Sequence, residues 1–302
     1  MVSNYPRRVK LVEVAPRDGL QNEPQFVDSD SKVEFINRLS NTGLEVIEVT
    51  SFVSPKWVPQ LADAEDVFSR ITRRHDVGYP VLVPNMRGME RALVAGAKEI
   101  AVFTAVSETF TRKNTNCTVD ESIERFTPVV EKAKNEAVRV RGYISCALGC
   151  PYEGSVDPER VAKLAHRLHQ LGCYEISLGD TIGAGTPLQA KSMVAAVARQ
   201  VPVDQLAIHF HDTRGQALAN ILVCLELGVS VIDASVSGLG GCPYANGATG
   251  NVASEDVLYM LQGLGIDTGV DLEKLINAGR FIDHKLDRES QSKVARVTFP
   301  SG

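Results

Sequence analysis

Short apolar segments alternate with longer amphipathic ones along nearly the whole chain, and this alternation restricts the fold more than any other feature. The apolar segments, such as Val9–Ala15, are short and carry β-branched residues, as buried strands do. In one amphipathic segment Thr118 and Glu121 form a capping box. In another, Thr186 is the cap and Pro187 the first helical residue. Strands that alternate with helices predict a parallel sheet covered by helices.

Eight strand–helix units of similar length follow one another. The strand-like segments are Val9–Ala15, Glu45–Ser51, Tyr79–Val83, Glu99–Thr104, Val140–Ser145, Glu175–Leu178, the apolar start of Leu206–Thr213, and Val231–Ser235. The helix-like segments are Ser31–Asn41, Ala62–Thr72, Gly88–Ala95, the segment from Thr118, Pro158–Gln170, the segment from Pro187, Gln216–Glu226 and Ser254–Leu261. No change of composition separates these units, so they predict one (β/α)8 TIM barrel over about residues 8–265, and not an open doubly wound sheet. Leu272–Leu286 predicts a C-terminal helical extension over about 270–302, within a single domain of residues 1–302.

Charge and composition argue against several classes of protein. The 302 residues carry a net charge of -5, whereas a nucleic-acid binder shows a basic stripe. No apolar run approaches the roughly 20 residues that a membrane span needs, and the N-terminus leaves no room for a signal or transit peptide. The six cysteines are scattered and do not resemble a disulfide framework. We therefore expect a protein of the reducing cytoplasm.

Polar residues collect where the predicted strands end. The active sites of (β/α)8 barrels lie at the C-terminal ends of the strands and in the loops that follow, so these residues are expected to meet there. Those for which we expect contact with a substrate are Arg17, Gln21, Ser51, Arg141, Tyr143, Ser177 and Thr181.

His209 and His211 lie two residues apart on one strand, so their side chains point to the same side. Alone, such a pair is equally compatible with a metal site and with hydrogen-bonded core histidines. Asp18 and Asn251 are placed at the ends of other strands, although the first also suits a turn and the second a helix cap. Together the four side chains form a mixed oxygen and nitrogen set without a thiolate. This set favours Mg²⁺ or Mn²⁺ held for catalysis over structural zinc.

Arg17 has two interpretations. It can form an ion pair at the mouth of the barrel with Glu13 or Glu48, because a buried charge needs a partner. It can also stabilise an oxyanion that develops on a substrate, because its charge is permanent. Glu13, Glu48 and Arg141 are interpreted as supporting residues more than as reactants.

The segment after the last predicted strand, Gly238–Asn251, is long and rich in glycine, as many active-site lids are. It is not a dinucleotide fingerprint, because Pro243 stands where glycine or alanine is required. Cys242, between glycine and proline, is a candidate acid or nucleophile. The alternative is an incidental surface cysteine.

Five segments resemble the signatures of one family. They are Val14–Glu23, Thr50–Gln60, Ser145–Tyr152, Ser177–Gly183 and the glycine segment with Cys242. They resemble the 3-hydroxy-3-methylglutaryl-CoA (HMG-CoA) lyase family, part of a superfamily of metal-dependent barrels that make or break bonds next to an acyl-CoA or an α-keto acid. The resemblance implies cleavage of HMG-CoA to acetoacetate and acetyl-CoA, in leucine breakdown and ketone-body formation.

The resemblance also implies roles for single residues. The divalent cation would be held by Asp18, His209, His211 and Asn251. Arg17 would stabilise the thioester enolate, and Asp18 or His209 would accept the hydroxyl proton. Cys242 would serve proton transfer to the product carbanion, with Glu48 and Asp180 supporting the site. We further expect a bacterial cytoplasmic homo-oligomer in which Arg112 and Lys113 are candidates for contact with the CoA phosphates.

Three alternatives stay open at this point. A synthase of the same superfamily would condense acetyl-CoA with an α-keto acid, but such enzymes usually carry an additional C-terminal domain. A metal-dependent hydrolase would normally place its His-x-His pair on the first strand, whereas here it is on the seventh. A non-catalytic acyl-CoA or metal-binding protein would not need Arg17 and Cys242 together.

Overall fold

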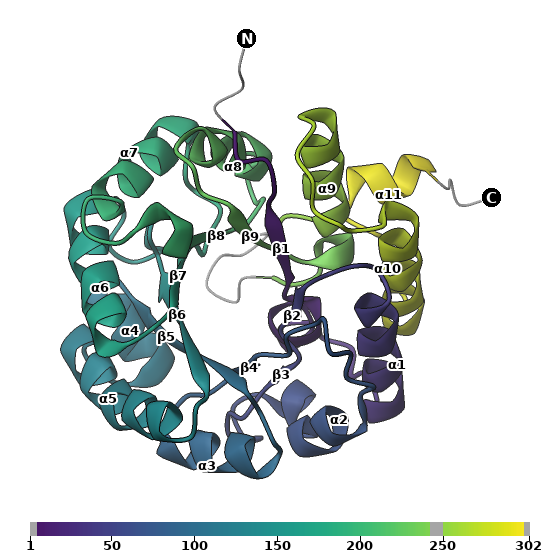
Figure 1. Cartoon of the computed structure of the whole chain (residues 1–302), viewed down its shortest axis with the longest axis horizontal. Helices are drawn as coiled ribbons and strands as arrows, with labels where there is room; N and C mark the ends of the chain where they lie inside the picture. The colour runs from purple at the N-terminus through teal and green to yellow at the C-terminus, as the bar shows by residue number, and fades with distance from the viewer. Residues whose placement is uncertain (1–4, 242–249, 299–302) are drawn as a thin grey trace.

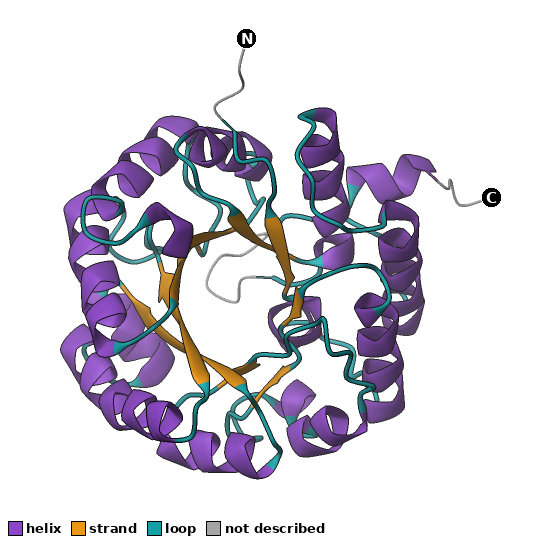
Figure 2. Ribbon diagram, in the orientation of Figure 1, coloured by secondary structure: helices purple, strands orange, loops and turns teal. Residues whose placement is uncertain are grey.

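The computed structural model describes residues 5–241 and 250–298, so that Cys242 lies outside the described residues. Within them, nine short parallel strands form one curled sheet in the order β2-β1-β9-β8-β7-β6-β5-β4-β3. The strands are β1 (Lys10–Glu13), β2 (Val46–Ile47), β3 (Thr50–Ser51), β4 (Val81–Leu82), β5 (Glu99–Ala105), β6 (Arg139–Ser145), β7 (Glu175–Asp180), β8 (Leu206–Phe210) and β9 (Val231–Ala234). Figures 1 and 2 show the strands on the inside and the helices around them. The predicted α/β class with a parallel sheet is confirmed.

The first and last strands of this order are neighbours in the sequence. The prediction of one continuous strand over Glu45–Ser51 is wrong in detail, because the segment forms β2 and β3 with two residues between them. β2 pairs with β1, and β3 pairs with β4. Between them, Glu48 N donates to Glu13 O (2.9 Å) and Val49 N donates to Pro80 O (3.0 Å). The hydrogen bonds thus alternate between two neighbours, and neither neighbour pairs with the whole segment.

The helices lie where the sequence places them, with differences of a few residues at their ends. They are α1 (Ser29–Ser40), α2 (Ala64–Arg70), α3 (Met86–Val94), α4 (Glu108–Thr115), α5 (Val119–Asn135), α6 (Pro158–Leu171), α7 (Pro187–Val197), α8 (Ala217–Glu226), α9 (Ser254–Gly263), α10 (Leu272–Leu286) and α11 (Lys293–Thr298). The capping box is confirmed, because Glu121 N donates to Thr118 Oγ1 (3.0 Å) and Thr118 N donates to the Glu121 carboxylate (2.7 Å).

A π-helical turn and two α-helices were not predicted. The first strand ends at Glu13, and Ala15–Gly19 forms a π-helical turn instead of continuing it. Helix α4 precedes the predicted α5 and begins at a cap in which Ser107 Oγ accepts from Phe110 N (3.0 Å). Helix α11 follows α10 in the C-terminal extension, and its short, charged sequence carries little helical pattern.

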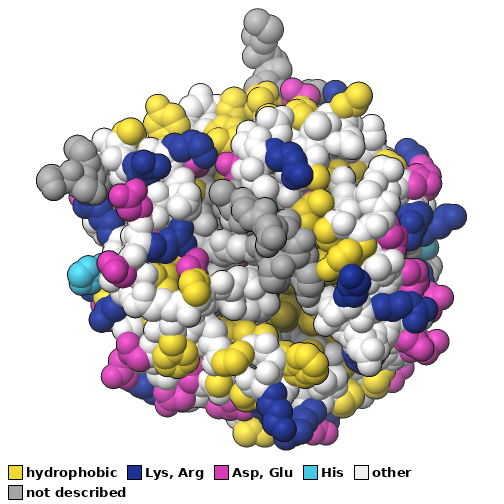
Figure 3. Space-filling view, turned by 180° about the vertical axis from the view of Figure 1, so that it is seen from behind, with side chains coloured by type: hydrophobic (Ala, Val, Ile, Leu, Met, Phe, Trp, Pro, Cys, Tyr) yellow, Lys and Arg dark blue, Asp and Glu magenta, His cyan; other side chains and the backbone are white. Residues whose placement is uncertain are grey.

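The C-terminal extension packs against the first and the last helices of the eight predicted strand–helix units. Helix α10 occupies the predicted Leu272–Leu286 and contacts α1, while α11 contacts α9 (Figure 1). On the face drawn in Figure 3, basic and acidic side chains are interspersed. Among the described residues, no helix combines the length and apolar character needed to cross a bilayer.

Two kinds of buried side chain fill the molecule. Apolar side chains from the helices and the sheet form one large core. The sheet interior also holds charged groups that are almost completely buried, among them Arg141, Glu175 and Asp233. Buried charges need partners, so the way these groups pair determines how the interior of the sheet is arranged.

Candidate active site

The π-helical turn after β1 places Arg17 and Asp18 at the edge where the strands end. The backbone N–H groups of Arg17, Asp18 and Gly19 all donate to Val14 O (3.2, 2.8 and 3.1 Å), which makes the turn tight. A Cβ at Gly19 would lie 2.9 Å from Leu239 Cβ, so the close approach to the segment after β9 requires glycine.

The structure brings together the four residues expected to hold a metal. Potential ligand atoms of Asp18, His209 and His211 all lie within 4.8 Å of one another. Asn251 joins them, because its Nδ2 donates to Asp18 Oδ2 (2.9 Å) and its backbone bridges to His211. The strand β8 supplies His209 and ends at Phe210, so His211 lies just beyond the strand that was expected to carry both histidines. The acid and the amide come from segments far apart in the sequence.

The protonation states of this group suit a divalent cation. Burial would raise the pKa of Asp18, but the charge of Arg17, together with the two histidines and the hydrogen bond from Asn251, holds this pKa well below its usual range. Burial, reinforced by His209, lowers the pKa of His211 to about 4, so its ring is neutral at pH 7. Its Nδ1 is buried and lacks a hydrogen-bond partner within residues 5–241 and 250–298. An anionic carboxylate next to a neutral, unpartnered imidazole nitrogen fits a metal ligand set.

Asp233, which the sequence analysis did not single out, holds His209 from behind. Its Oδ2 lies 3.3 Å from His209 Nδ1, and the Nε2 of the same ring faces Asp18 Oδ2 at 3.7 Å. Burial would raise the pKa of Asp233, but the charge of Arg141 and the hydrogen bonds with His209 and Arg141 together lower it and keep this carboxylate ionised. A carboxylate on the far nitrogen of a histidine fixes the tautomer and ring orientation that a metal requires. An acid in the middle of the apolar strand Val231–Ala234 was the signal for this role.

Arg141 and Ser177, both expected to contact the substrate, are turned toward Asp233 instead. Arg141 donates to both carboxylate oxygens of Asp233 (2.6 and 2.9 Å) and from Nε to Glu175 Oε1 (2.6 Å). Ser177 Oγ donates to Asp233 Oδ2 (2.8 Å). Lys10 Nζ closes the row by donating to Glu175 Oε2 (2.7 Å). A row of alternating charges, half-buried at Lys10 and buried from Glu175 onward, therefore runs through the sheet interior to His209.

Arg17 is held by two carboxylates. Its Nε and Nη2 bind Glu48 Oε2 (2.8 and 2.7 Å), and its Nη1 donates to Asp18 Oδ1 (2.5 Å). Of the two ion pairs considered, the structure contains the one with Glu48. The carboxylate of Glu13 instead accepts backbone N–H groups, from Ala15 and Val236. A guanidinium has five N–H groups, so these bonds leave Arg17 with donors for an oxygen of a ligand.

Tyr143 lies between the two arginines. Its hydroxyl accepts from Arg141 Nη1 (2.8 Å) and donates to Glu48 Oε2 (3.2 Å). Its ring also lies 5.4 Å from the Arg17 guanidinium carbon and 5.9 Å from the centre of the His209 ring. Glu48 Oε1 is buried and without a hydrogen-bond partner in the described part of the chain. Tyr143 and Glu48 therefore border the same space as Arg17 and His209.

For the remaining expected residues, the described hydrogen bonds go to other parts of the chain. The carboxylate of Asp180 accepts from Ala184 N (3.1 Å) and Gly185 N (2.8 Å), so it organises the loop after β7. Thr181 Oγ1 accepts from Cys146 N (2.8 Å). The other two are Ser51, whose hydroxyl faces Leu82 O (3.4 Å), and the half-buried Gln21.

Comparison with known proteins places the chain among relatives. Residues 8–282 match the model of the HMGL-like family. The chain belongs to the HMGL-like family. A mitochondrial hydroxymethylglutaryl-CoA lyase of Mus musculus is 60% identical over 297 residues, which are 98% of this chain and 91% of that protein.

Solved structures of this HMGL-like protein's relatives have the same fold. A hydroxymethylglutaryl-CoA lyase from Pseudomonas aeruginosa superposes with a TM-score of 0.96 at 56% identity, covering 98% of both chains. An HMG-CoA lyase from Acinetobacter baumannii, in complex with coenzyme A and 3-methylmalate, superposes with a TM-score of 0.93 at 38% identity, covering 100% of this chain and 97% of that one. The relatives thus match the sheet with its surrounding helices and the C-terminal extension together.

Proposed function

We propose that this protein is an HMG-CoA lyase, a carbon–carbon lyase that cleaves HMG-CoA to acetoacetate and acetyl-CoA. The observation that carries the proposal is the 60% identity to a lyase of that name over 98% of the chain. The convergence of Asp18, His209 and His211 on one point supports it, because this cleavage needs a cation and a base at the same place.

The cation we propose is Mg²⁺ or Mn²⁺, held by Asp18, His209, His211 and the amide oxygen of Asn251. Oxygen and imidazole ligands without a thiolate support a choice of this kind. Bound there, the ion would polarise the oxygens of the substrate as a Lewis acid.

The residues around the cation have separate tasks in the proposed reaction. Asp18 or His209 accepts the proton of the tertiary hydroxyl, and the bond between C2 and C3 of the substrate breaks. The carbonyl of acetoacetate forms, and the electron pair of the broken bond passes to the thioester, which becomes an enolate. The free N–H groups of Arg17 stabilise its oxygen. A proton delivered to the enolate carbon completes acetyl-CoA.

Cys242 is our candidate for that last proton transfer. Glu48 and Asp180 are proposed as residues that support the site. The thiol lies outside the described residues, so its role stays a prediction from the sequence. Turnover should fall in Cys242→Ala, while Mn²⁺ affinity stays at the wild-type value. Unchanged turnover would remove Cys242 from the mechanism.

The direct test is to incubate the protein with HMG-CoA and Mg²⁺ and to measure acetoacetate. Release of acetoacetate in proportion to acetyl-CoA is the expected result. Condensation of acetyl-CoA with an α-keto acid, in place of cleavage, would favour the synthase alternative. Binding of the CoA ester without product would favour a non-catalytic protein.

Asp233→Asn should weaken metal binding although Asp233 is not a proposed ligand. The amide cannot hold His209 through a charged acceptor, so the ring loses its fixed tautomer. We expect the Kd for Mn²⁺, measured from the EPR signal of free Mn²⁺, to rise about 10–100-fold. Ser177→Ala, which removes one neutral hydrogen bond to the same carboxylate, should have a smaller effect. A folded Asp233→Asn protein with wild-type Mn²⁺ affinity would contradict the role.

We also propose that the sheet closes as an eight-stranded (β/α)8 barrel within a single domain. Support comes from the segment Val46–Ser51, whose two halves pair with β1 and with β4.

We further propose that the protein is a cytoplasmic homo-oligomer of bacterial origin. The phosphates of CoA are proposed to bind near Arg112 and Lys113, which are exposed on α4. Light scattering of the purified protein tests the assembly, and charge removal at Lys113 with KM as the readout tests the phosphate site.

A further inference from the structure

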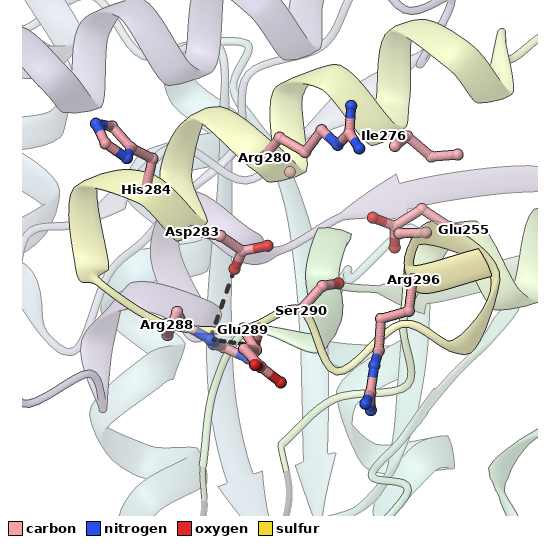
Figure 4. Close-up of a pocket in the computed structure, with 11 residues that line it drawn as sticks. Glu255, Ile276, Arg280, Asp283, His284, Arg288, Glu289, Ser290 and Arg296 are labelled. Atoms are coloured by element: carbon pink, nitrogen blue, oxygen red, sulfur yellow. Dashed lines mark hydrogen bonds and ion pairs between the residues drawn. The ribbon is translucent and has the colours of Figure 1, made fainter. Parts of the chain in front are cut away.

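Arg288 lies where the C-terminal extension turns back toward the sheet. Helix α10 is followed by Asp287 in a left-handed conformation (φ 47°), and Arg288 N donates to Asp283 O (3.1 Å). Figure 4 shows Arg288 facing Asp283 at a cavity of about 350 Å³ between α10 and the residues that follow it. The Arg288 side chain is only 16% exposed, so its charge needs partners inside the protein.

The guanidinium of Arg288 joins three segments that are far apart in the sequence. Its Nη1 donates to Glu23 Oε1 (2.7 Å), in the segment after the π-helical turn. Its Nη2 donates to Ser237 O (3.4 Å), in the turn after β9. Its Nε lies 3.6 Å from Asp283 Oδ1 on α10. A planar fork can hold these partners at once, which the single ammonium of a lysine cannot do.

Ser237 is a strained residue that the extension fixes. Its backbone is left-handed (φ 61°), which costs a non-glycine residue free energy unless its surroundings hold it. Its N–H donates to both oxygens of Glu255 (3.0 Å), and its carbonyl accepts from Gln291 N (3.0 Å). Its hydroxyl bonds to Asp283 and Ser290. The path of the chain after β9 is therefore set from the C-terminal extension.

Glu23 passes this restraint to the metal site. The same Oε1 that binds Arg288 accepts from Gly240 N (3.3 Å). Gly240 has φ +117°, and a Cβ there would lie 2.9 Å from Asn251 Nδ2 and 3.7 Å from Asp18 O. The backbone of Gly240 thus lies directly against two of the four proposed metal ligands.

We propose that Arg288 is a positioning residue for the metal site. By holding Glu23 it fixes the backbone of Gly240. Gly240 in turn keeps Asp18 and Asn251 at the spacing that a cation requires. The inference rests on the metal site in the proposed function and adds a residue of the C-terminal extension to it.

The test is to titrate Mn²⁺ into the metal-free protein and to measure the free Mn²⁺ by its EPR signal. In Arg288→Met the Kd for Mn²⁺ should rise about tenfold, at the low end for residues that support ligands without touching the metal. Turnover of this variant should return toward the wild-type value at saturating Mn²⁺. Because metal binding also stabilises a folded protein, circular dichroism of the metal-free variant at the temperature of the titration must show it folded before the Kd is compared.

The double variant Glu23→Gln/Arg288→Met separates positioning from charge neutralisation. Arg288→Met leaves the half-buried Glu23 without its cation, so the Tm should fall. Glu23→Gln removes that unpaired charge, so the Tm of the double variant should recover. Mn²⁺ binding should stay weak, because nothing then holds residue 23 in place. This variant also provides the comparison if Arg288→Met alone does not fold.

A control variant breaks an arginine–aspartate pair between α5 and α6, outside the residues proposed for the metal site. Arg167 Nη1 lies 2.6 Å from Asp120 Oδ1, and both side chains are largely exposed. Arg167→Met should change neither the Kd for Mn²⁺ nor turnover.

Two results would overturn the inference alone, and a third would overturn the proposed metal site together with it. One is wild-type Mn²⁺ affinity in folded Arg288→Met. The other is recovery of both Tm and Mn²⁺ affinity in the double variant, which would reduce Arg288 to neutralising Glu23. If the wild-type protein itself binds no Mn²⁺, the proposed metal site fails, and the inference fails with it.

Discussion

His211→Ala is expected to remove turnover while the protein stays folded. Chelation of divalent metal should have the same effect on the wild-type protein, and Mg²⁺ or Mn²⁺ should restore it. The reason is that His211 Nδ1 is a buried nitrogen without a hydrogen-bond partner among the described residues, on a ring whose pKa is lowered to about 4. A metal contributes several kcal/mol to stabilising charge in such a reaction, so we expect roughly a 10³-fold loss or more.

A second histidine provides a matched control. His166 on α6 is half-buried, and its Nδ1 is also buried without a hydrogen-bond partner in the described segments. His166→Ala removes a comparable ring from a helix and not from the strand ends, so turnover and Mn²⁺ affinity should stay unchanged. Circular dichroism of both variants checks the fold. Full turnover of His211→Ala, or of the wild-type protein in excess chelator, would exclude the metal-dependent reaction.

The approach of the four proposed ligands was predictable because of the sheet. The carboxyl ends of parallel strands lie at one edge, so polar residues that end different strands meet there whatever their separation in the sequence. From the sequence alone, that rule predicts that Asp18 lies near His209 and His211. It needed only the order of strand-like segments, and errors of a few residues in their ends did not affect it.

Residues inside the sheet were harder to predict. Arg141 was expected to contact the substrate, yet the structure turns its guanidinium onto Asp233 and Glu175. These three residues lie on β6, β7 and β9, and whether they meet depends on the register between strands and on side chains that cross the interior. The alternation of apolar and polar residues does not encode either of these. For the same reason Asp233 was missed, although an acid within an apolar strand marked it.

The π-helical turn at Ala15–Gly19 shows a different limit. Its residues carry no local pattern for this rare conformation, so the sequence indicates only that a strand ends. The turn forms because Val14 O accepts three N–H groups at once and because Gly19 permits the close approach of Leu239. Both conditions depend on the packed structure. The position of Arg17 relative to Glu48 follows from these two conditions. The sequence alone therefore did not decide whether Arg17 pairs with Glu13 or with Glu48.

Arg17→Lys is expected to lower turnover by roughly 10²-fold or more, the loss seen when an oxyanion donor is removed. Lysine keeps the positive charge between Asp18 and Glu48, so the Tm and Mn²⁺ affinity should change little. It loses the fork, however, and one ammonium cannot serve both carboxylates and still stabilise an enolate oxygen. Steady-state kinetics at saturating Mg²⁺ measure the effect, which should appear in kcat because the oxygen becomes charged only as the bond breaks.

Glu48→Gln distinguishes this role from a structural ion pair. Glu48→Gln weakens the Arg17–Glu48 ion pair by changing Glu48 and leaving Arg17 intact, because the Nε and Nη2 bonds of Arg17 lose a charged acceptor. If Arg17 serves only to balance Glu48, this variant should lose as much turnover as Arg17→Lys. If Arg17 stabilises the enolate, Glu48→Gln should retain more turnover, since the guanidinium and its free N–H groups are still present. A large fall in Tm with near-normal kcat in Arg17→Lys would decide for the structural role, because the fork would then matter to the folded state and not to the reaction.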